Sequence, residues 1–189
     1  MTGADIEAAL QAVGDLLAET GPPIRLVVVG GASLSVGGWV ARATTDVDVL
    51  ARATAAGLVH PDPLPDALVR AAATVARDFR LAPDWLNTHV ALQRSQGMPP
   101  GLARDLDWRT YGPLSVGFAG RRTLIALKLF AAADRGPRNV RVQDLLALRP
   151  TDDELRTAAT WVQTQDASPV FADLLDDVIR HAQRQRTNP

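Results

Sequence analysis

Two carboxylates that lie two residues apart, shortly after a pair of glycines, are the residues of this chain most suited to chemistry. Asp46 and Asp48 flank Val47, and 15 residues separate Gly31 from Asp46. Alternate side chains of a strand share a face, so both carboxylates are expected on the same face. Neighbouring carboxylates repel each other unless a cation lies between them, and oxygen ligands of this kind suit Mg²⁺. The spacing therefore indicates a magnesium site.

The glycine pair adds an anion site to this prediction. A β-branched segment ends at Val29, Gly30-Gly31 follow, and a helix is expected from Ala32 onward. Such a junction exposes backbone N–H groups to a phosphate, and glycine allows the phosphate a close approach. Ser33 adds a hydroxyl in the first turn. Each piece alone is commonly a simple turn or a solvated strand end, but together they suit nucleotide chemistry.

A single lysine supplies a further candidate. Lys128 is the one lysine among 20 Lys and Arg residues, and it lies within an apolar stretch. Its ammonium group is suited to act as a point charge for a phosphate, although its stem could instead lie along a helix edge. Asp144 follows on the next predicted helix, where it could simply be a surface residue.

Hydrophobic periodicity predicts the elements that position these residues. Helices are expected over 5–18 and 64–79, and strands over 25–29, 47–50 and 114–119. Residues 83–112 are predicted to be rich in loops. The rest of the chain is expected to form four helices, over 121–134, 140–149, 152–164 and 169–185. We therefore expect an α/β (α+β) fold in which a small mixed-sheet core, 1–120, precedes a helical C-terminal subdomain, 121–189.

Composition excludes several classes of function. The chain has 189 residues, of which 47% are hydrophobic and 22% charged, as in an average globular protein. The absence of cysteine excludes a disulfide framework and a thiolate zinc site, and three scattered histidines argue against an all-histidine metal site. The net charge of -1 excludes a wholly basic coat for nucleic acid. With no apolar run near the roughly 20 residues of a membrane span and an acidic start, we expect a cytoplasmic protein without a membrane partner.

The order of these motifs resembles the nucleotidyltransferase superfamily. The resemblance is closer to its AbiEii/MenT-like branch, which includes toxins of bacterial toxin–antitoxin pairs. It rests on Gly30-Gly31-Ala32-Ser33-Leu34, on Arg42-x-Thr44-x-Asp46-x-Asp48, and on Lys128 followed by Asp144. The segment Asp84-Trp85-Leu86-Asn87 also resembles one that is common in these relatives. The resemblance covers about residues 20–150 and implies that the 1–120 core has the nucleotidyltransferase fold.

The resemblance also implies a role for each residue. Asp46 and Asp48 would hold Mg²⁺ on a nucleoside triphosphate, and Lys128 would contact a phosphate or the leaving pyrophosphate. Asp144 would orient Lys128 or accept a proton from the attacking hydroxyl. The nucleotide would be bound by the glycine turn and the loop after it, namely Gly30, Gly31, Ser33, Arg42 and Thr44. The reaction would move a nucleoside monophosphate to an acceptor and release pyrophosphate.

Charge distribution bears on the acceptor. Residues 121–149 carry seven basic and two acidic side chains, whereas residues 151–177 carry one basic and seven acidic. The basic block favours an RNA acceptor such as tRNA, with the RNA backbone held by Arg135, Arg138 and Arg141, although these arginines would also suit a solvated helix face. A cognate antitoxin is an implied partner.

Alternatives remain open at this stage. The acceptor could be a small molecule or a protein, or the domain could bind a nucleotide or a partner without catalysis. Many polymerase-like nucleotidyltransferases place a third carboxylate on a neighbouring strand. The predicted strand at 114–119 has none, which leaves the choice between one and two metal ions open.

Overall fold

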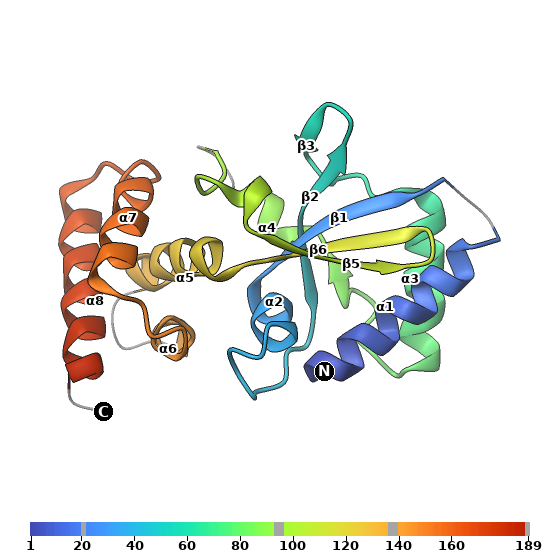
Figure 1. Cartoon of the computed structure of the whole chain (residues 1–189), viewed down its shortest axis with the longest axis horizontal. Helices are drawn as coiled ribbons and strands as arrows, with labels where there is room; N and C mark the ends of the chain where they lie inside the picture. The colour runs from blue at the N-terminus through green and yellow to red at the C-terminus, as the bar shows by residue number, and fades with distance from the viewer. Residues whose placement is uncertain (20–21, 93–96, 136–139, 188–189) are drawn as a thin grey trace. The chain divides into compact units, whose positions relative to one another are not determined.

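The structure is a computed structural model that describes residues 1–19, 22–92, 97–135 and 140–187 (Figure 1). The chain divides into two compact units. The first unit comprises residues 1–94 and 106–119, and the second comprises residues 95–105 and 120–189. The segment 95–105 thus groups with the C-terminal helices. Within the described ranges, no helix combines the length and apolar character needed to cross a membrane.

A mixed sheet of six strands forms the framework of the first unit. The strands run in the order β3-β2-β1-β6-β5, and β4 pairs with β2. β1 is parallel to β6 and antiparallel to β2, whereas β4 is parallel to β2. The strand bounds are β1 Ile24–Val29, β2 Val47–Thr54, β3 Gly57–Val59, β4 Leu86–Asn87, β5 Leu106–Tyr111 and β6 Leu114–Ala119.

The helices of the first unit pack on this sheet. α1 (Gly3–Leu17) contacts α3 (Asp66–Asp78), and their apolar residues form one core with alternate residues of β1, β2 and β6. α2 (Gly30–Val36) follows β1 directly, and α4 (His89–Leu92) follows β4. Val47 and Val49 are fully buried in the core, so Asp48 between them lies on the opposite face of β2.

A charged cluster ties α1 to β5. Arg109 donates hydrogen bonds to Glu7 on α1 and to Asp107, with 3.1 Å between its Nη2 and the Asp107 Oδ2. The Tyr111 hydroxyl lies 3.5 Å from Glu7 Oε1. Burial and the nearby charge of Glu7 raise the pKa of Tyr111 to about 12. Gly14 is also essential here, because a Cβ on Gly14 would lie 2.0 Å from the Tyr111 carbonyl oxygen.

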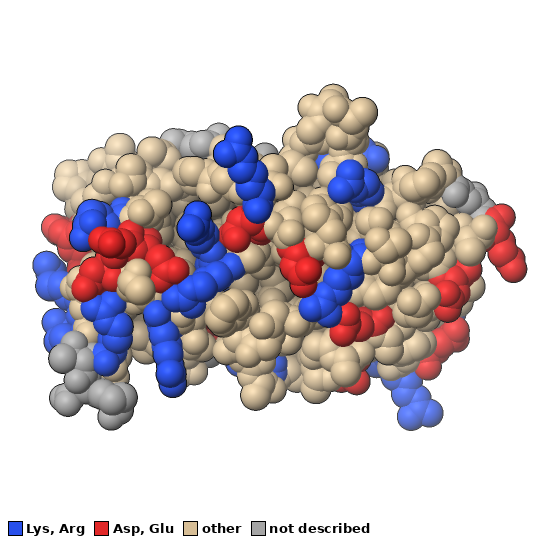
Figure 2. Space-filling model, in the orientation of Figure 1, with Lys and Arg blue, Asp and Glu red and all other residues tan. Residues whose placement is uncertain are grey.

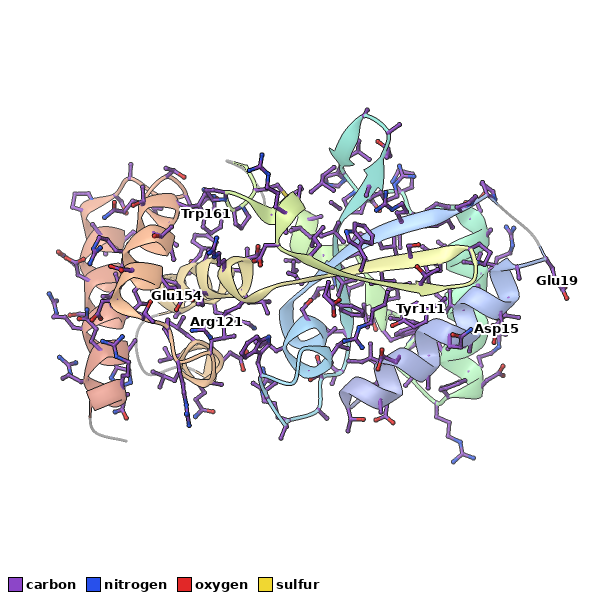
Figure 3. The ribbon with its side chains drawn as sticks, in the orientation of Figure 1. Asp15, Glu19, Tyr111, Arg121, Glu154 and Trp161 are labelled. Carbon is purple, nitrogen blue, oxygen red and sulfur yellow. The ribbon has the colours of Figure 1, made fainter. Side chains whose placement is uncertain are left out.

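Four helices form most of the second unit, and α5 contacts the other three. The rings of Phe130 and Trp161 meet edge to face, with 6.1 Å between centroids. Arg121 pairs with Glu154 through two hydrogen bonds of 2.9 and 3.0 Å and also donates to the carbonyls that follow α6 (Figure 3). The bounds are α5 Arg121–Arg135, α6 Val140–Ala147, α7 Asp152–Val162, α8 Pro169–Thr187 and a 3₁₀ turn at Leu102–Arg104.

The mixed α+β class with a helical C-terminal part is confirmed, and so are the strands predicted at 25–29, 47–50 and 114–119. The loop prediction for 83–112 was wrong in part, because this range contains β4, α4, the 3₁₀ turn and β5. β5 mixes charged, polar and aromatic residues and has exposed positions on both faces, so it lacks the apolar run by which a buried strand is recognised.

Candidate functional site

The turn after β1 brings a carboxylate against the glycine backbone. Gly30 has φ +72°, a conformation that strains residues with a Cβ. A Cβ at this position would lie 2.5 Å from Asp48 Oδ2. Val29 pairs with Asp48 across β1 and β2, which fixes this approach through the sheet register. The structure therefore brings together Gly30 and Asp48, two residues predicted separately for phosphate and metal binding.

Gly31 lies against the loop that carries Asp46. A Cβ on Gly31 would lie 2.5 Å from Thr44 Oγ1. Thr44 in turn donates a hydrogen bond of 3.2 Å to Asp46 Oδ1, and its backbone N–H donates to the Met1 carbonyl at 2.9 Å. Both aspartates are half-buried. The four residues Gly31, Thr44, Asp46 and Asp48 thus lie around the end of β1.

The oxygen atoms at the end of β1 are suited as ligands to a hard cation. Asp46 and Asp48 supply carboxylate oxygens, and the Thr44 hydroxyl adds a further oxygen. Over the described part of the chain, no group of three or more His, Cys, Asp and Glu residues is placed to hold a metal ion. Mg²⁺ commonly binds through one or two carboxylates and completes its shell with substrate phosphates and water, so this set fits Mg²⁺.

Ser33 and Arg42 are placed differently from the other predicted ligands. Ser33 is 1% exposed, and its hydroxyl donates to the Val28 carbonyl at 2.8 Å and accepts the Ala119 N–H at 3.2 Å. Its side chain therefore joins α2 to β1 and β6 rather than facing solvent. Arg42 is exposed in the loop between α2 and β2, where its carbonyl accepts the Ser35 hydroxyl at 3.2 Å.

In the second unit, Lys128 and Asp144 form an ion pair. Lys128 Nζ lies 2.7 Å from Asp144 Oδ2, and the side chains are 14% and 4% exposed. The pair joins α5 to α6 through a charge-assisted hydrogen bond in surroundings with little water. The geometry agrees with the predicted role of Asp144 in orienting Lys128. The alternative that Asp144 is a surface residue is wrong, because only 3% of it is exposed.

The three arginines predicted to bind RNA cannot be placed. The side chains of Arg135, Arg138 and Arg141 lie outside the described part of the chain. Elsewhere in the second unit, basic and acidic side chains are interspersed on the face shown in Figure 2. Exposed ion pairs account for some of them, such as the 2.7 Å contact between Arg156 and Asp153.

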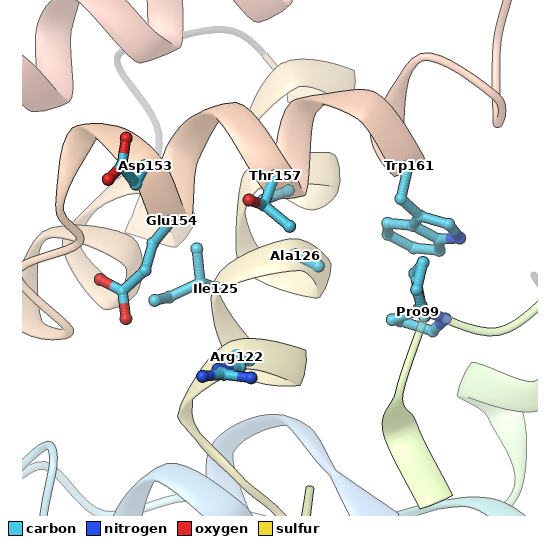
Figure 4. Close-up of a pocket in the computed structure, with 10 residues that line it drawn as sticks. Pro99, Arg122, Ile125, Ala126, Asp153, Glu154, Thr157 and Trp161 are labelled. Atoms are coloured by element: carbon cyan, nitrogen blue, oxygen red, sulfur yellow. The ribbon is translucent and has the colours of Figure 1, made fainter. Parts of the chain in front are cut away.

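The helical unit also contains a pocket of about 430 Å³ between α5, α7 and the segment at Pro99 (Figure 4). Trp161 and Pro99 lie at one end, and Asp153 and Glu154 at the other. Burial raises the pKa of Glu154, but the hydrogen bonds from Arg121 and the Thr151 backbone outweigh burial and hold that pKa below its ordinary value. None of the residues predicted from sequence lines this pocket.

One residue beside the carboxylates was missed by the sequence reasoning. The search for a third carboxylate considered the strand that is now β6, but β6 pairs with β1 and β5 and not with β2. The residue beside Asp48 on β4 is Asn87. Its segment, Asp84 to Asn87, was recognised in the sequence, but without the pairing nothing connected Asn87 to Asp48.

In comparisons with known proteins, no family model, curated protein or solved structure matches the chain. A function must therefore be argued from the residues of the site.

Proposed function

We propose that this chain is a Mg²⁺-dependent nucleotidyltransferase that moves a nucleoside monophosphate from a nucleoside triphosphate to an acceptor. The observation that carries the proposal is the contact of the glycine turn with the carboxylate motif. Gly30 abuts Asp48, and Gly31 abuts Thr44, which is hydrogen-bonded to Asp46. A cation held by the two carboxylates would lie next to backbone that has no side chains to keep a phosphate away.

The chemistry requires few protein groups. Mg²⁺ at Asp46 and Asp48 would neutralise charge on the phosphate oxygens. The acceptor hydroxyl would form a bond to the α-phosphorus, the bond between the α-phosphorus and the bridging oxygen would break, and pyrophosphate would leave with that electron pair. The hydroxyl proton would pass to a carboxylate or to water. Positioning and charge stabilisation contribute most of the catalysis in such transfers.

Lys128 would supply positive charge to the triphosphate or to the leaving pyrophosphate. Its pairing with Asp144 supports this role, because a carboxylate 2.7 Å away fixes the position of the ammonium group. A buried ion pair with a purely structural role would have the same geometry. Mutation of both residues is therefore needed to separate the two roles of Lys128.

For the acceptor we propose RNA, specifically tRNA, and for the biological role the toxin of a toxin–antitoxin pair in the cytoplasm. The seven basic side chains of residues 121–149 support a polyanionic acceptor. The order of the motifs supports the toxin role through its resemblance to the AbiEii/MenT-like branch. A small-molecule or protein acceptor is the outcome to consider if RNA is not modified.

A transfer assay tests the proposal. The purified chain is incubated with Mg²⁺, total bacterial tRNA and each labelled nucleoside triphosphate in turn. Asp48→Asn removes one charge from the site at constant size, and Asp78→Asn is the matched control on the exposed end of α3. We expect label on tRNA with the parent and the control but not with Asp48→Asn.

Two other outcomes redirect or refute the proposal. If calorimetry shows Mg²⁺-dependent nucleotide binding but no label appears on tRNA, then tRNA is excluded as the acceptor. A small-molecule or protein acceptor would be tested next. If nucleotide binding is absent, or is equally strong in Asp48→Asn, the proposed enzyme function is wrong.

A further inference from the structure

Asn87 flanks Asp48 on the side of β2 that faces away from β1. β4 runs parallel to β2, with Val47 opposite Leu86 and Asp48 opposite Asn87. Leu86 joins the core beside Val47, so the next residue, Asn87, shares the face of Asp48. Neighbouring strands lie about 4.8 Å apart, which makes these two side chains direct neighbours.

Asn87 is held firmly in this position. Its side chain is buried, with 8% of the residue exposed, and its Oδ1 accepts the backbone N–H of His89 at 3.0 Å. Two residues earlier, Trp85 is fully buried, and its indole N–H donates to the Ala72 carbonyl on α3 at 3.1 Å. Because the amide oxygen accepts from His89 at the start of α4, the –NH₂ group is the other polar end of the side chain and is a hydrogen-bond donor.

An amide –NH₂ group has consequences for cation binding. It donates hydrogen bonds and cannot ligate a metal ion. Two catalytic metal ions about 3.5–4 Å apart need shared carboxylates between them, whereas Asp46 and Asp48 alone suffice for one Mg²⁺. A carboxylate at position 87 would be a third anionic ligand, and asparagine is its neutral counterpart of the same size.

We propose that Asn87 makes this a one-metal site. Asp46 and Asp48 bind a single divalent cation, and the Asn87 –NH₂ group acts as a positioning residue that donates a hydrogen bond to a phosphate oxygen of the nucleotide. The inference deepens the nucleotidyltransferase function proposed above and rests on it.

A purely structural role for Asn87 makes a different prediction. Asn87 could serve only to accept the His89 N–H at the start of α4. Aspartate accepts such a bond equally well, so Asn87→Asp preserves that role and changes only the charge beside Asp48. If Asn87 serves only that role and its side chain is directed away from the Asp48 carboxylate, the added charge is remote from the site and metal binding is unchanged in Asn87→Asp.

The experiment counts bound metal rather than activity. Mn²⁺ alone is titrated into the full chain, and free Mn²⁺ is followed by electron paramagnetic resonance. Only Mn²⁺ that is lost in Asp48→Asn is assigned to the site, which excludes binding at surface carboxylates. We expect one such Mn²⁺ in the parent. In Asn87→Asp we expect a second Mn²⁺, or one held about tenfold more tightly, since affinity rises with ligand charge.

Each remaining outcome overturns either the one-metal inference alone or both proposals. Two Asp48-dependent Mn²⁺ ions in the parent, or the same binding in Asn87→Asp as in the parent, would refute the one-metal inference and leave the nucleotidyltransferase proposal standing. If no Mn²⁺ binding depends on Asp48, the metal site itself is wrong, and both proposals fail. The parent stoichiometry decides the inference even if Asn87→Asp does not fold.

Discussion

The Lys128–Asp144 pair allows catalysis and stability to be separated by mutation. Lys128→Met keeps the aliphatic stem and removes the ammonium group 2.7 Å from the carboxylate of Asp144, whose side chain is 4% exposed. Asp144→Leu removes the opposite charge. Lys128→Met/Asp144→Leu replaces the ion pair by two apolar side chains in the same helical unit.

The size of the effect follows from burial. Removing one member of a buried ion pair costs about 3–5 kcal/mol. Lys128 is 14% exposed, so we expect the lower end of that range for Lys128→Met. For a chain of this length each kcal/mol lowers Tm by about 2–4 °C, which gives a decrease of about 6–12 °C. The double variant removes both charges of the pair, so a coupling energy of about 1–3 kcal/mol should restore much of the stability.

Thermal melting and the tRNA transfer assay are measured on the same samples. The matched control is Arg156→Met, because Arg156 and Asp153 also lie 2.7 Å apart but their side chains are 73% and 84% exposed. That change should alter the free energy of unfolding by less than about 1 kcal/mol. If Lys128 supplies charge to the triphosphate, turnover should stay low in the double variant although its stability recovers.

Two results would refute this reasoning. If Lys128→Met melts at the same temperature as Arg156→Met, the pair does not behave as buried. If the double variant regains turnover together with stability, Lys128 is a structural residue, and its proposed contact with a phosphate is wrong.

Three further predictions concern other parts of the fold. Gly31→Ala should cost about 1–3 kcal/mol and lower transfer activity, since its Cβ would lie 2.5 Å from Thr44 Oγ1; melting and the transfer assay measure both effects. Tyr111 is the single tyrosine, so ultraviolet absorbance should show tyrosinate only near pH 12, and Glu7→Gln should lower that pKa. Between pH 10 and 12 the unfolded chain loses this proton first, so stability should fall as pH rises. Glu154 has a lowered folded-state pKa, so its stabilising contribution should be complete above its ordinary pKa of 4.5 and disappear as pH falls, as urea unfolding at several pH values would reveal.

Local patterns were sufficient to predict most of the fold. The apolar runs of β1, β2 and β6 and the periodic helices after residue 120 each carry their own signal, and the structure contains all of them. β4 has two residues and β3 has three, so neither is long enough for a pattern. Their strand character comes from pairing with β2, which is a tertiary interaction.

The same distinction applies to the candidate site. The two-residue period of a strand is local, and Val47 and Val49 are indeed buried on one face while Asp48 lies on the other. Asp46 precedes the first residue of β2, so its place on the same face as Asp48 stays a prediction. The hydroxyl of Ser33 could not be placed, because its partners are the Val28 carbonyl and Ala119 on β6. A sequence shows which groups are available, but not which of them the fold itself uses.

Asn87 shows the largest gap between sequence and structure. In the sequence, a strand next to β2 was of interest only because a third carboxylate was expected on it. The segment considered for that strand was 114–119. The parallel pairing of β4 with β2 replaces it by a segment anchored through the buried Trp85. A search limited to acidic residues would pass over an asparagine there. In the one-metal proposal this neutral amide is decisive, because it would leave only Asp46 and Asp48 to supply anionic ligands. The number of metal ions would then depend on a residue that only the strand register places beside Asp48.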